Sequence, residues 1–234
     1  MTYNVIRTGS DGNCTILDGI IAVDMGIPYR EIKPYEKKLK LVLLTHQHGD
    51  HFKRGTVCML AGVRPSLRWA CCHWLVPFLL DAGVKKPQID VLVPDQWYEY
   101  KGIGYINPFE TMHNVQNCGW RYCNTSREYA LYATDLGAMD GIEAKNYDLY
   151  LLEANHKEAE IDARAAAKLE AGEFAYETAA AENHLSYEQA IEWLHANMGT
   201  KSLWIPMHGH KERTEAKDGK SDHKGESENI QGRK

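Results

Sequence analysis

The sequence predicts an α/β protein in which two mixed β-sheets pack face to face, an α+β sandwich with helices on the outside. Three observations lead to this fold class. Short β-type runs separated by turn residues dominate the first half, strong helix formers dominate the second half, and two strand-rich halves each finish with a helix. The 234 residues, 44% of them hydrophobic, are enough to bury the core of one domain.

Residues 1–210 are expected to form that single domain. The strand predictions rest on apolar runs that end at turn residues, and the run at 39–45 (LKLVLLT) is apolar almost throughout, as in a strand buried on both faces. Further strands are expected at 3–8, 14–18, 20–24, 89–93, 97–100, 103–107, 119–124, 128–133, 147–154 and 202–207. Residues 211–234 have almost no apolar side chains and are expected to be a disordered polar tail.

The helix predictions rest on composition and on end signals. The segments TVCMLAG and WLVPFLLDAG each end in Gly, and residues 156–172 are rich in Ala, Glu and Lys. Residues 185–199 begin with Ser186, carry Gln189 three positions later and end at Gly199. That pattern predicts a capping box at the start of the helix and a glycine stop at its end.

The composition of the chain limits the kinds of partner that it is expected to bind. A net charge of -5 argues against a broad electrostatic grip on duplex nucleic acid, which needs many Lys and Arg contacts to phosphates. No apolar stretch approaches the ~20 residues of a membrane span, and residues 1–10 lack a signal-peptide pattern. We therefore expect a cytoplasmic protein with no membrane partner. The six cysteines form no CxxC pair and are expected to be mostly reduced core residues.

The stretch LVLLTHQHGDHF concentrates metal-ligand side chains directly after the buried strand. His46, His48, Asp50 and His51 lie within six positions. Because alternate residues of an extended chain face the same way, a turn that begins at Thr45 can aim His46 and His48 together. Imidazole and carboxylate groups are ligands for zinc and also suit manganese. Four such residues exceed what one three-ligand catalytic site needs, so the sequence predicts two metal ions.

Three further candidates lie later in the chain, each just after a predicted strand. His113 follows INPFET, Asp135 follows YALYAT, and His208 follows SLWIPM. Functional side chains commonly occupy loops that a rigid scaffold holds in place. The two oxygens of Asp135 suit a carboxylate that bridges two cations.

The motif THQHGDH resembles the HxHxDH signature of the metallo-β-lactamase fold. His113, Asp135 and His208 match the remaining metal positions of that superfamily, and Asp24 in IIAVDMG resembles its buried aspartate behind the metal loop. The resemblance covers residues 3–210 and implies the αββα arrangement. It also implies that one zinc or manganese ion is held by His46, His48 and His113, a second by Asp50, His51 and His208, and that Asp135 bridges them.

Later segments resemble one branch of the superfamily. TDLG, LLEANH and NHLS are similar to YycJ-type exonucleases and their phage relatives, distant kin of ribonuclease Z, in which the histidine of HLS faces the substrate phosphate. The resemblance implies a catalytic role for His184, as a hydrogen-bond donor to a phosphate oxygen or as the acid that protonates the leaving alcohol. A helix-capping or surface histidine is the alternative for this residue. His210 is the alternative to His208 in MHGHKE, and His156 is expected in a loop or at a helix start.

The expected function is hydrolysis of phosphodiester bonds in nucleotides, with Asp50 orienting the attacking water as well as binding metal. Two substrates remain open, namely the end of a nucleic acid and a small or cyclic nucleotide of the kind that phage anti-defence enzymes cleave in the host cytoplasm. An acyl hydrolase, a thioesterase or lactonase of the glyoxalase II type, shares every ligand and is the main alternative. A non-catalytic binding module is the third. The resemblance also makes a homodimer an expectation.

Overall fold

The computed structural model describes residues 1–171 and 183–209. Its first sheet runs in the order β1-β2-β3-β4-β5-β6, antiparallel from β1 to β3 and parallel from β3 to β6. These strands are β1 (Tyr3–Arg7), β2 (Cys14–Leu17), β3 (Ile21–Val23), β4 (Leu41–Leu43), β5 (Arg68–Cys71) and β6 (Ile89–Val91).

The second sheet is also mixed, with three parallel strands where the first has four. Its order is β12-β11-β10-β9-β8-β7, parallel from β12 to β10 and antiparallel from β10 to β7. The strands are β7 (Tyr98–Tyr100), β8 (Gly104–Thr111), β9 (Asn117–Asn124), β10 (Tyr129–Ala133), β11 (Leu149–Glu153) and β12 (Leu203–Met207).

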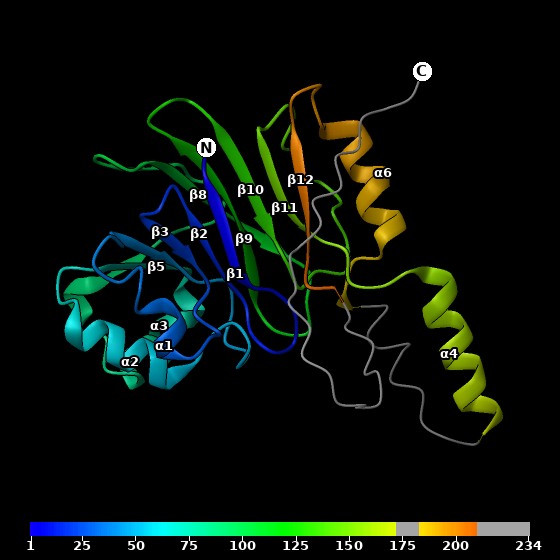
Figure 1. Ribbon diagram of the computed structural model, residues 1–234, viewed down its shortest axis with the longest axis horizontal. Coiled ribbons are helices and arrows are strands. Elements are labelled where there is room, and N and C mark those ends of the chain that lie inside the picture. The colour runs from blue at the N-terminus through cyan, green and yellow to red at the C-terminus, as the bar shows by residue number, and fades with distance from the viewer. Residues whose placement is uncertain (172–182, 210–234) are drawn as a thin grey trace.

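Helices cover the outer face of each sheet (Figure 1). The first sheet carries α1 (Tyr29–Ile32), α2 (Arg54–Val63) and α3 (Val76–Asp81), with short 3-10 helices η1 (His73–Leu75) and η2 (Lys86–Gln88). The second sheet carries α6 (Tyr187–Asn197), whereas α4 (Glu158–Glu170) projects away from the body (Figure 1). Within the described residues, no helix combines the length and apolar character that a membrane span requires.

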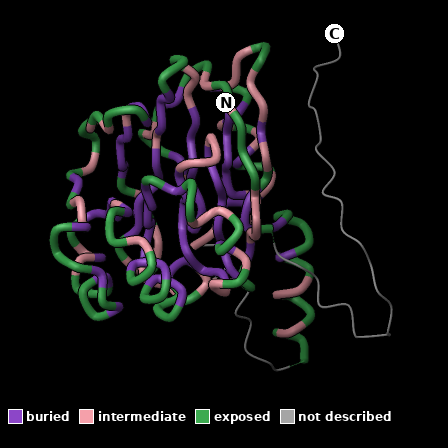
Figure 2. The backbone as a smooth tube through the Cα atoms, turned by 60° about the vertical axis from the view of Figure 1, so that its left-hand side comes forward, coloured by how far each residue is buried: buried purple, intermediate pink, exposed green. Residues whose placement is uncertain are grey.

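Three buried clusters separate these layers and confirm the predicted fold class. One cluster lies between the first sheet and its helices, one lies between the two sheets, and one lies between the second sheet and α6. The buried segments accordingly run through the centre of the molecule, while exposed residues concentrate in loops and on helix surfaces (Figure 2). Burial on both faces explains why β4 is apolar throughout, since its three residues are fully buried.

The helix α6 starts as its capping box predicts. The Ser186 hydroxyl accepts a hydrogen bond from the Gln189 backbone N–H at 3.0 Å, and the Gln189 side chain accepts one from the Ser186 N–H at 2.9 Å. The predicted helix at 156–172 is shorter in the structure, Glu158–Glu170. The polar tail at 211–234 lies outside the described residues, so its disorder stays a prediction.

Three elements were absent from the sequence interpretation, namely β5, α1 and the short η2. The strand β5 (RWAC) has no alternation to reveal it, because Trp69, Ala70 and Cys71 are all buried. Helix α1 has only four residues between Pro28 and Pro34, too few to show a helical period. All six cysteines are free, and five of them are buried, whereas Cys58 is exposed.

The strand β8 is longer than the expected 103–107 because it continues through Pro108 to Thr111. Pro108 pairs with Trp120 of β9, but its carbonyl accepts from the Asp95 N–H on the opposite side. The ring nitrogen therefore points away from β9, and the ladder between β8 and β9 loses no donor. The extra residues carry the strand up to the loop that holds His113.

Candidate metal centre

The loop that carries the HxHxDH motif leaves β4 and is held by the N-terminal segment. The Asp50 carbonyl accepts a hydrogen bond of 2.6 Å from the Asn13 backbone N–H, and the Asn13 side-chain amide lies 2.8 Å from Nε2 of His51. The backbone N–H of Met25 donates to the His51 carbonyl at 2.8 Å. The loop is therefore fixed to β2 and to the segment after β3 as well as to β4.

Gly26 permits this close approach. A Cβ atom at residue 26 would lie 1.6 Å from the Asp50 carbonyl oxygen. We expect Gly26→Ala to lower the free energy of unfolding by about 3 kcal/mol, since backbone at this distance must move. The matched control is Gly62→Ala in α2, where a Cβ meets no heavy atom within 4 Å and alanine favours the helix. Chemical denaturation measures both, and equal stability of the two variants would contradict the close approach.

Asp24 fixes the orientation of the loop from behind. This carboxylate is fully buried and accepts hydrogen bonds from the Thr45 backbone N–H at 3.0 Å and the Tyr132 hydroxyl at 3.2 Å. Its Oδ2 lies 2.7 Å from Nδ1 of His51. Because a carboxylate only accepts, Nδ1 of His51 carries the proton, and Nε2, which faces the Asn13 amide and Asp135, is the nitrogen that could bind a metal. Asp24 therefore acts behind the ligands, as the resemblance implies.

Two other histidines are oriented in the same manner. Nδ1 of His46 lies 3.0 Å from the Thr45 hydroxyl, whose proton is directed to Asp24. Nδ1 of His113 lies 3.2 Å from the Asn183 carbonyl oxygen. In both cases the protein accepts at Nδ1, so that Nε2 is the nitrogen left to a cation. Nδ1 of His208 lies 3.3 Å from Oε1 of Glu153 and 3.2 Å from the side-chain amide nitrogen of Asn155, while its Nε2 faces Asp50.

The first cluster of ligand-type atoms joins His46, His48 and His113, which lie within 4.8 Å of one another. Nε2 of His46 is 3.1 Å from Nδ1 of His48. The rings of His46 and His48 both contact the His113 ring edge-on, with centroids 5.3 and 5.2 Å away. The structure therefore brings together the three residues that the resemblance assigns to one metal.

The second cluster joins Asp50, His51, Asp135 and His208 within the same limit. Oδ2 of Asp50 is 3.6 Å from Nε2 of His51 and 3.4 Å from Nε2 of His208. Asp135 lies between the two clusters: Oδ2 is 2.8 Å from Nε2 of His51, and Oδ1 is 3.9 Å from Nε2 of His113. This is the position that a bridging carboxylate needs.

The donor set fits two divalent cations. Two ligands that each lie about 2.1 Å from one tetrahedral zinc are separated by about 3.4 Å, close to the spacings within both clusters. Nε2 of His113 and Oδ2 of Asp135 are buried and have no hydrogen-bond partner among the described residues. The short approach of Oδ2 to His51 lacks hydrogen-bond geometry. Leaving such atoms unpaired is costly unless a cation binds them.

Backbone conformation also marks the centre. Asp24, Asp135 and His208 have φ angles of 60°, 58° and 54°, in the left-handed region that side chains other than glycine rarely adopt. Each of them lies one or two residues after the end of a strand. Local strain of this kind collects at functional sites, where the surrounding packing maintains it.

Histidines of the two clusters have pKa values that are shifted in opposite directions. Burial lowers the pKa of His46 well below its usual value, and it also lowers the pKa of His113, so both rings are neutral. Burial opposes the charging of His51, but the carboxylates of Asp135 and Asp24 raise its pKa well above the usual value. Burial also opposes the charging of His208, but hydrogen bonds to Asp50 and Glu153 raise its pKa to about 10.

Binding of a cation to the second cluster of the metal-free protein is therefore expected to release protons. His51 and His208 must be neutral to bind a cation. Because their pKa values are raised, they hold protons at neutral pH, and metal affinity should rise as pH increases from 6.5 towards about 10. Calorimetric titration of Zn²⁺ in two buffers with different ionisation enthalpies measures the protons released. Affinity that falls with rising pH would contradict this assignment.

Beside the second cluster, His184 pairs with a carboxylate that the sequence interpretation missed. Nδ1 of His184 lies 2.7 Å from Oε1 of the fully buried Glu153, the last residue of β11. Oε2 of Glu153 accepts from the backbone N–H groups of Leu136 and Leu185 at 2.9 and 3.3 Å. The signal for Glu153 was a charged residue at the end of the apolar run YDLYLLE.

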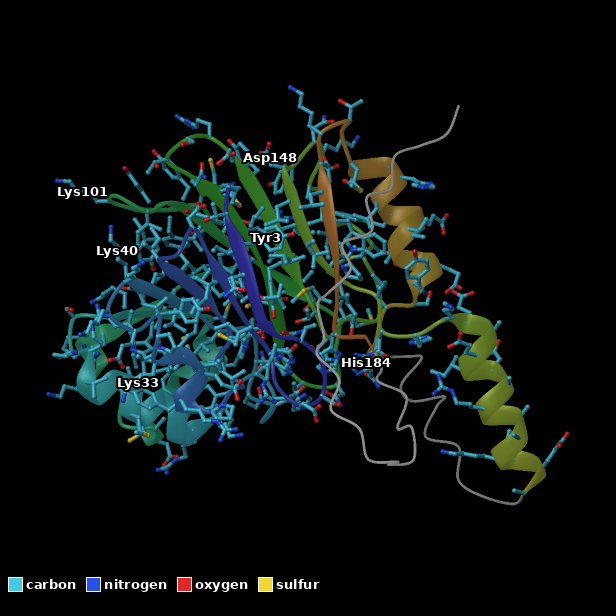
Figure 3. All side chains as sticks on the ribbon, in the orientation of Figure 1. Tyr3, Lys33, Lys40, Lys101, Asp148 and His184 are labelled. Carbon is cyan, nitrogen blue, oxygen red and sulfur yellow. The ribbon has the colours of Figure 1, made fainter. Side chains whose placement is uncertain are left out.

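The His184 ring stacks on His208, with centroids 5.2 Å apart and an interplanar angle of 10°, and lies at the end of β12 (Figure 3). Because Glu153 holds Nδ1, Nε2 of His184 is left for another partner. His184 is half-buried and lies two residues before the N-cap Ser186, so the capping and surface interpretations do not describe it. It lies instead with the candidate metal residues.

The other histidines that the structure describes, apart from His184, lie outside the candidate metal centre. His156 is buried, pairs with Ser186 in an isolated β-bridge and precedes α4, as expected for a loop or helix start. His73 begins η1 and is exposed. His195 is exposed on α6. His210 lies outside the described residues, and the structure places His208 at the second cluster.

Comparisons with known proteins agree with this architecture. The chain is similar to the metallo-beta-lactamase fold protein YhfI from Bacillus subtilis, with a TM-score of 0.67 and 17% identity over 89% of this chain and 86% of that chain. It is similar to the short form of human tRNase Z, with a TM-score of 0.68 and 13% identity over 90% and 93% of the two chains. At these identities the likeness supports the fold alone.

A third structure, a diphosphatase from the PhnP family, gives a TM-score of 0.57 at 14% identity over 89% of this chain and 86% of that chain. A comparison with curated proteins found no match. Residues 27–208 match the family model of the beta-lactamase superfamily domain, a span that is well over half of the chain and includes both clusters. The chain therefore belongs to the beta-lactamase superfamily.

Proposed function

We propose that this chain is a dinuclear metal-dependent phosphodiesterase that hydrolyses phosphodiester bonds of nucleotide substrates. The observation that carries the proposal is the Glu153–His184 pair placed against two ligand clusters that share Asp135. His46, His48 and His113 would hold one cation, and Asp50, His51 and His208 the other. Two such cations would supply Lewis acidity and an activated water, and the separation of about 3.5–4 Å that is usual between the metals of two-metal sites suits the oxygens of a phosphodiester.

The residues of the chain would divide the remaining work. The carboxylate of Asp50 is partly exposed and lies within the second cluster, where it can accept a hydrogen bond from the attacking water and orient it. His184 would bind a non-bridging oxygen or give a proton to the leaving alcohol through Nε2. Glu153 would keep the imidazole in position and stabilise its charged form, as a buried carboxylate does for a catalytic histidine.

A proton donor of this kind supports phosphodiester over thioester hydrolysis, because an alkoxide leaving group needs protonation more than a thiolate does. The names of two structural neighbours, a tRNase Z and a diphosphatase, add support, since both refer to phosphorus–oxygen chemistry. The segments TDLG and NHLS extend the proposal to the YycJ-like branch. Zinc is the proposed metal, with manganese as the alternative.

The test combines metal analysis with a substrate panel. The protein is expected to bind about two zinc or manganese ions per chain and to hydrolyse bis(p-nitrophenyl) phosphate. A chelator should abolish the activity, and added Zn²⁺ or Mn²⁺ should restore it. Thioester and lactone substrates run in parallel test the acyl alternative. Faster hydrolysis of either, or no phosphodiester turnover with any metal, would overturn the proposal, and less than about one ion per chain would favour a binding module.

A further inference from the structure

A hollow of about 380 Å³ opens beside the first ligand cluster. It is lined by the loop between β8 and β9 and by Trp74 of η1, and His113 belongs both to this hollow and to the metal cluster. A substrate group bound at the candidate metals therefore has this hollow as an adjoining space. The volume falls in the range of small-molecule sites and exceeds what a phosphate alone would occupy.

The side chains that line the hollow include an aromatic ring, a thioether and several polar groups. Trp74 is half-buried and contributes an aromatic ring, and Met112 contributes a thioether that is 71% exposed, the largest exposed fraction among the large hydrophobic side chains of the described residues. Asn114 and Gln116 add exposed amides, and Glu110 adds an exposed carboxylate. Methionine adapts to flat ligands and contacts aromatic rings favourably, so its exposure here has a functional explanation.

Charge separates two classes of ligand. None of the described residues that line the hollow is Lys or Arg, and Glu110 is negative. A nucleic-acid strand that continued through this space would bring further phosphates next to a carboxylate without a compensating cation. An uncharged heteroaromatic ring can instead stack on indole and thioether and form hydrogen bonds with amides and a carboxylate.

We propose that this hollow binds the base of a small nucleotide whose phosphodiester lies at the candidate metals, with Trp74 and Met112 as the stacking surfaces. The proposal rests on the proposed function and narrows its substrate from nucleic-acid ends to small nucleotides. Trp74 also supports the metal loop, because its indole N–H donates to the Thr45 carbonyl at 3.4 Å. This hydrogen bond connects the surface proposed to stack on the base with the loop that carries His46.

Binding can be tested without catalysis. Protein labelled with ¹³C at the methionine methyl groups is titrated with adenosine, which has no phosphate and needs no metal. The Met112 resonance, identified by its loss in Met112→Ser, should shift in a saturable way. Met59, 52% exposed on α2 and outside the hollow, is the matched internal control. No shift of Met112 at millimolar adenosine, or an equal shift of Met59, would overturn the proposal.

A kinetic test uses two substrates that differ in the presence of a nucleoside. The ratio of kcat/KM for thymidine 5′-p-nitrophenyl phosphate to that for methyl p-nitrophenyl phosphate should fall at least about five-fold in Trp74→Leu, as loss of base stacking predicts. Trp97→Leu is the control, since Trp97 is 46% exposed and does not line the hollow. Met112→Ser should lower the same ratio. Because the Met112 side chain is exposed, this variant keeps the test valid if Trp74→Leu does not fold.

The outcomes separate the inference from the proposed function. If the protein hydrolyses both substrates and the ratio is unchanged in Trp74→Leu and Met112→Ser, the base site is wrong and the phosphodiesterase stands. If it hydrolyses neither substrate, the proposed function fails, and the adenosine titration still decides whether the hollow binds a base.

Discussion

Asp135→Asn is expected to lower kcat/KM for bis(p-nitrophenyl) phosphate by at least about 10³-fold, since a shared ligand contributes several kcal/mol of charge stabilisation at both cations. The side chain is 3% exposed, and its oxygens face His51 on one side and His113 on the other. Asparagine keeps the shape but replaces one carboxylate oxygen with an NH₂ group, which cannot bind a cation. Bound metal should fall from about two ions per chain to about one.

The measurement pairs steady-state kinetics with metal analysis of the same sample. Asp140→Asn is the matched control, because Asp140 is exposed on the loop that follows Asp135 and belongs to neither cluster. It should retain the metal content and the rate of the unmodified protein. Full metal content and an unchanged rate in Asp135→Asn would remove this residue from its bridging position.

His184→Gln is expected to lower kcat by about 10²–10⁴-fold, the usual contribution of a positioned acid, while metal content stays at the level of the unmodified protein. The effect should depend on the leaving group. A poor leaving alcohol needs the proton that His184 would supply through Nε2, whereas p-nitrophenolate leaves without it. The loss should therefore be larger for an alkyl ester than for a p-nitrophenyl ester.

Glu153→Gln tests the same pair from the other side, because an amide can accept from Nδ1 but cannot stabilise the charged imidazole. We expect it to reproduce the leaving-group dependence at smaller size. His195→Gln is the control, since His195 is exposed on α6. A loss in His184→Gln that is equal for good and poor leaving groups would show that the residue does not act as the acid.

The ligand clusters could be predicted from the sequence because their signals are local. Each candidate follows the carboxyl end of a strand, and four of them share one loop. The position of Glu153 could not be predicted in the same way. Its role depends on β11 meeting a segment 31 residues later, where Leu185 donates to it and His184 pairs with it. The spacing of residues in the sequence does not reveal a contact between such distant segments.

The same reason applies to the hollow and to β5. Trp74 and Met112 are far apart in the chain and lie together only because η1 and the loop after β8 end at the same side of the molecule. The strand β5 was missed because tertiary burial, rather than alternation, defines it. Local pattern thus identified the chemistry of the centre, and packing between distant segments supplied its supporting residues.

The centre is divided between the two sheets, and this division has a consequence for biosynthesis. His46, His48, Asp50 and His51 follow β4 of the first sheet, whereas His113, Asp135 and His208 follow strands of the second, of which β12 is the last to leave the ribosome. A nascent chain that stops before residue 203 has neither His208 nor β12, one of the two parallel partners of β11. If the second cluster binds a cation as proposed, its uptake would report that both sheets have been synthesised and assembled.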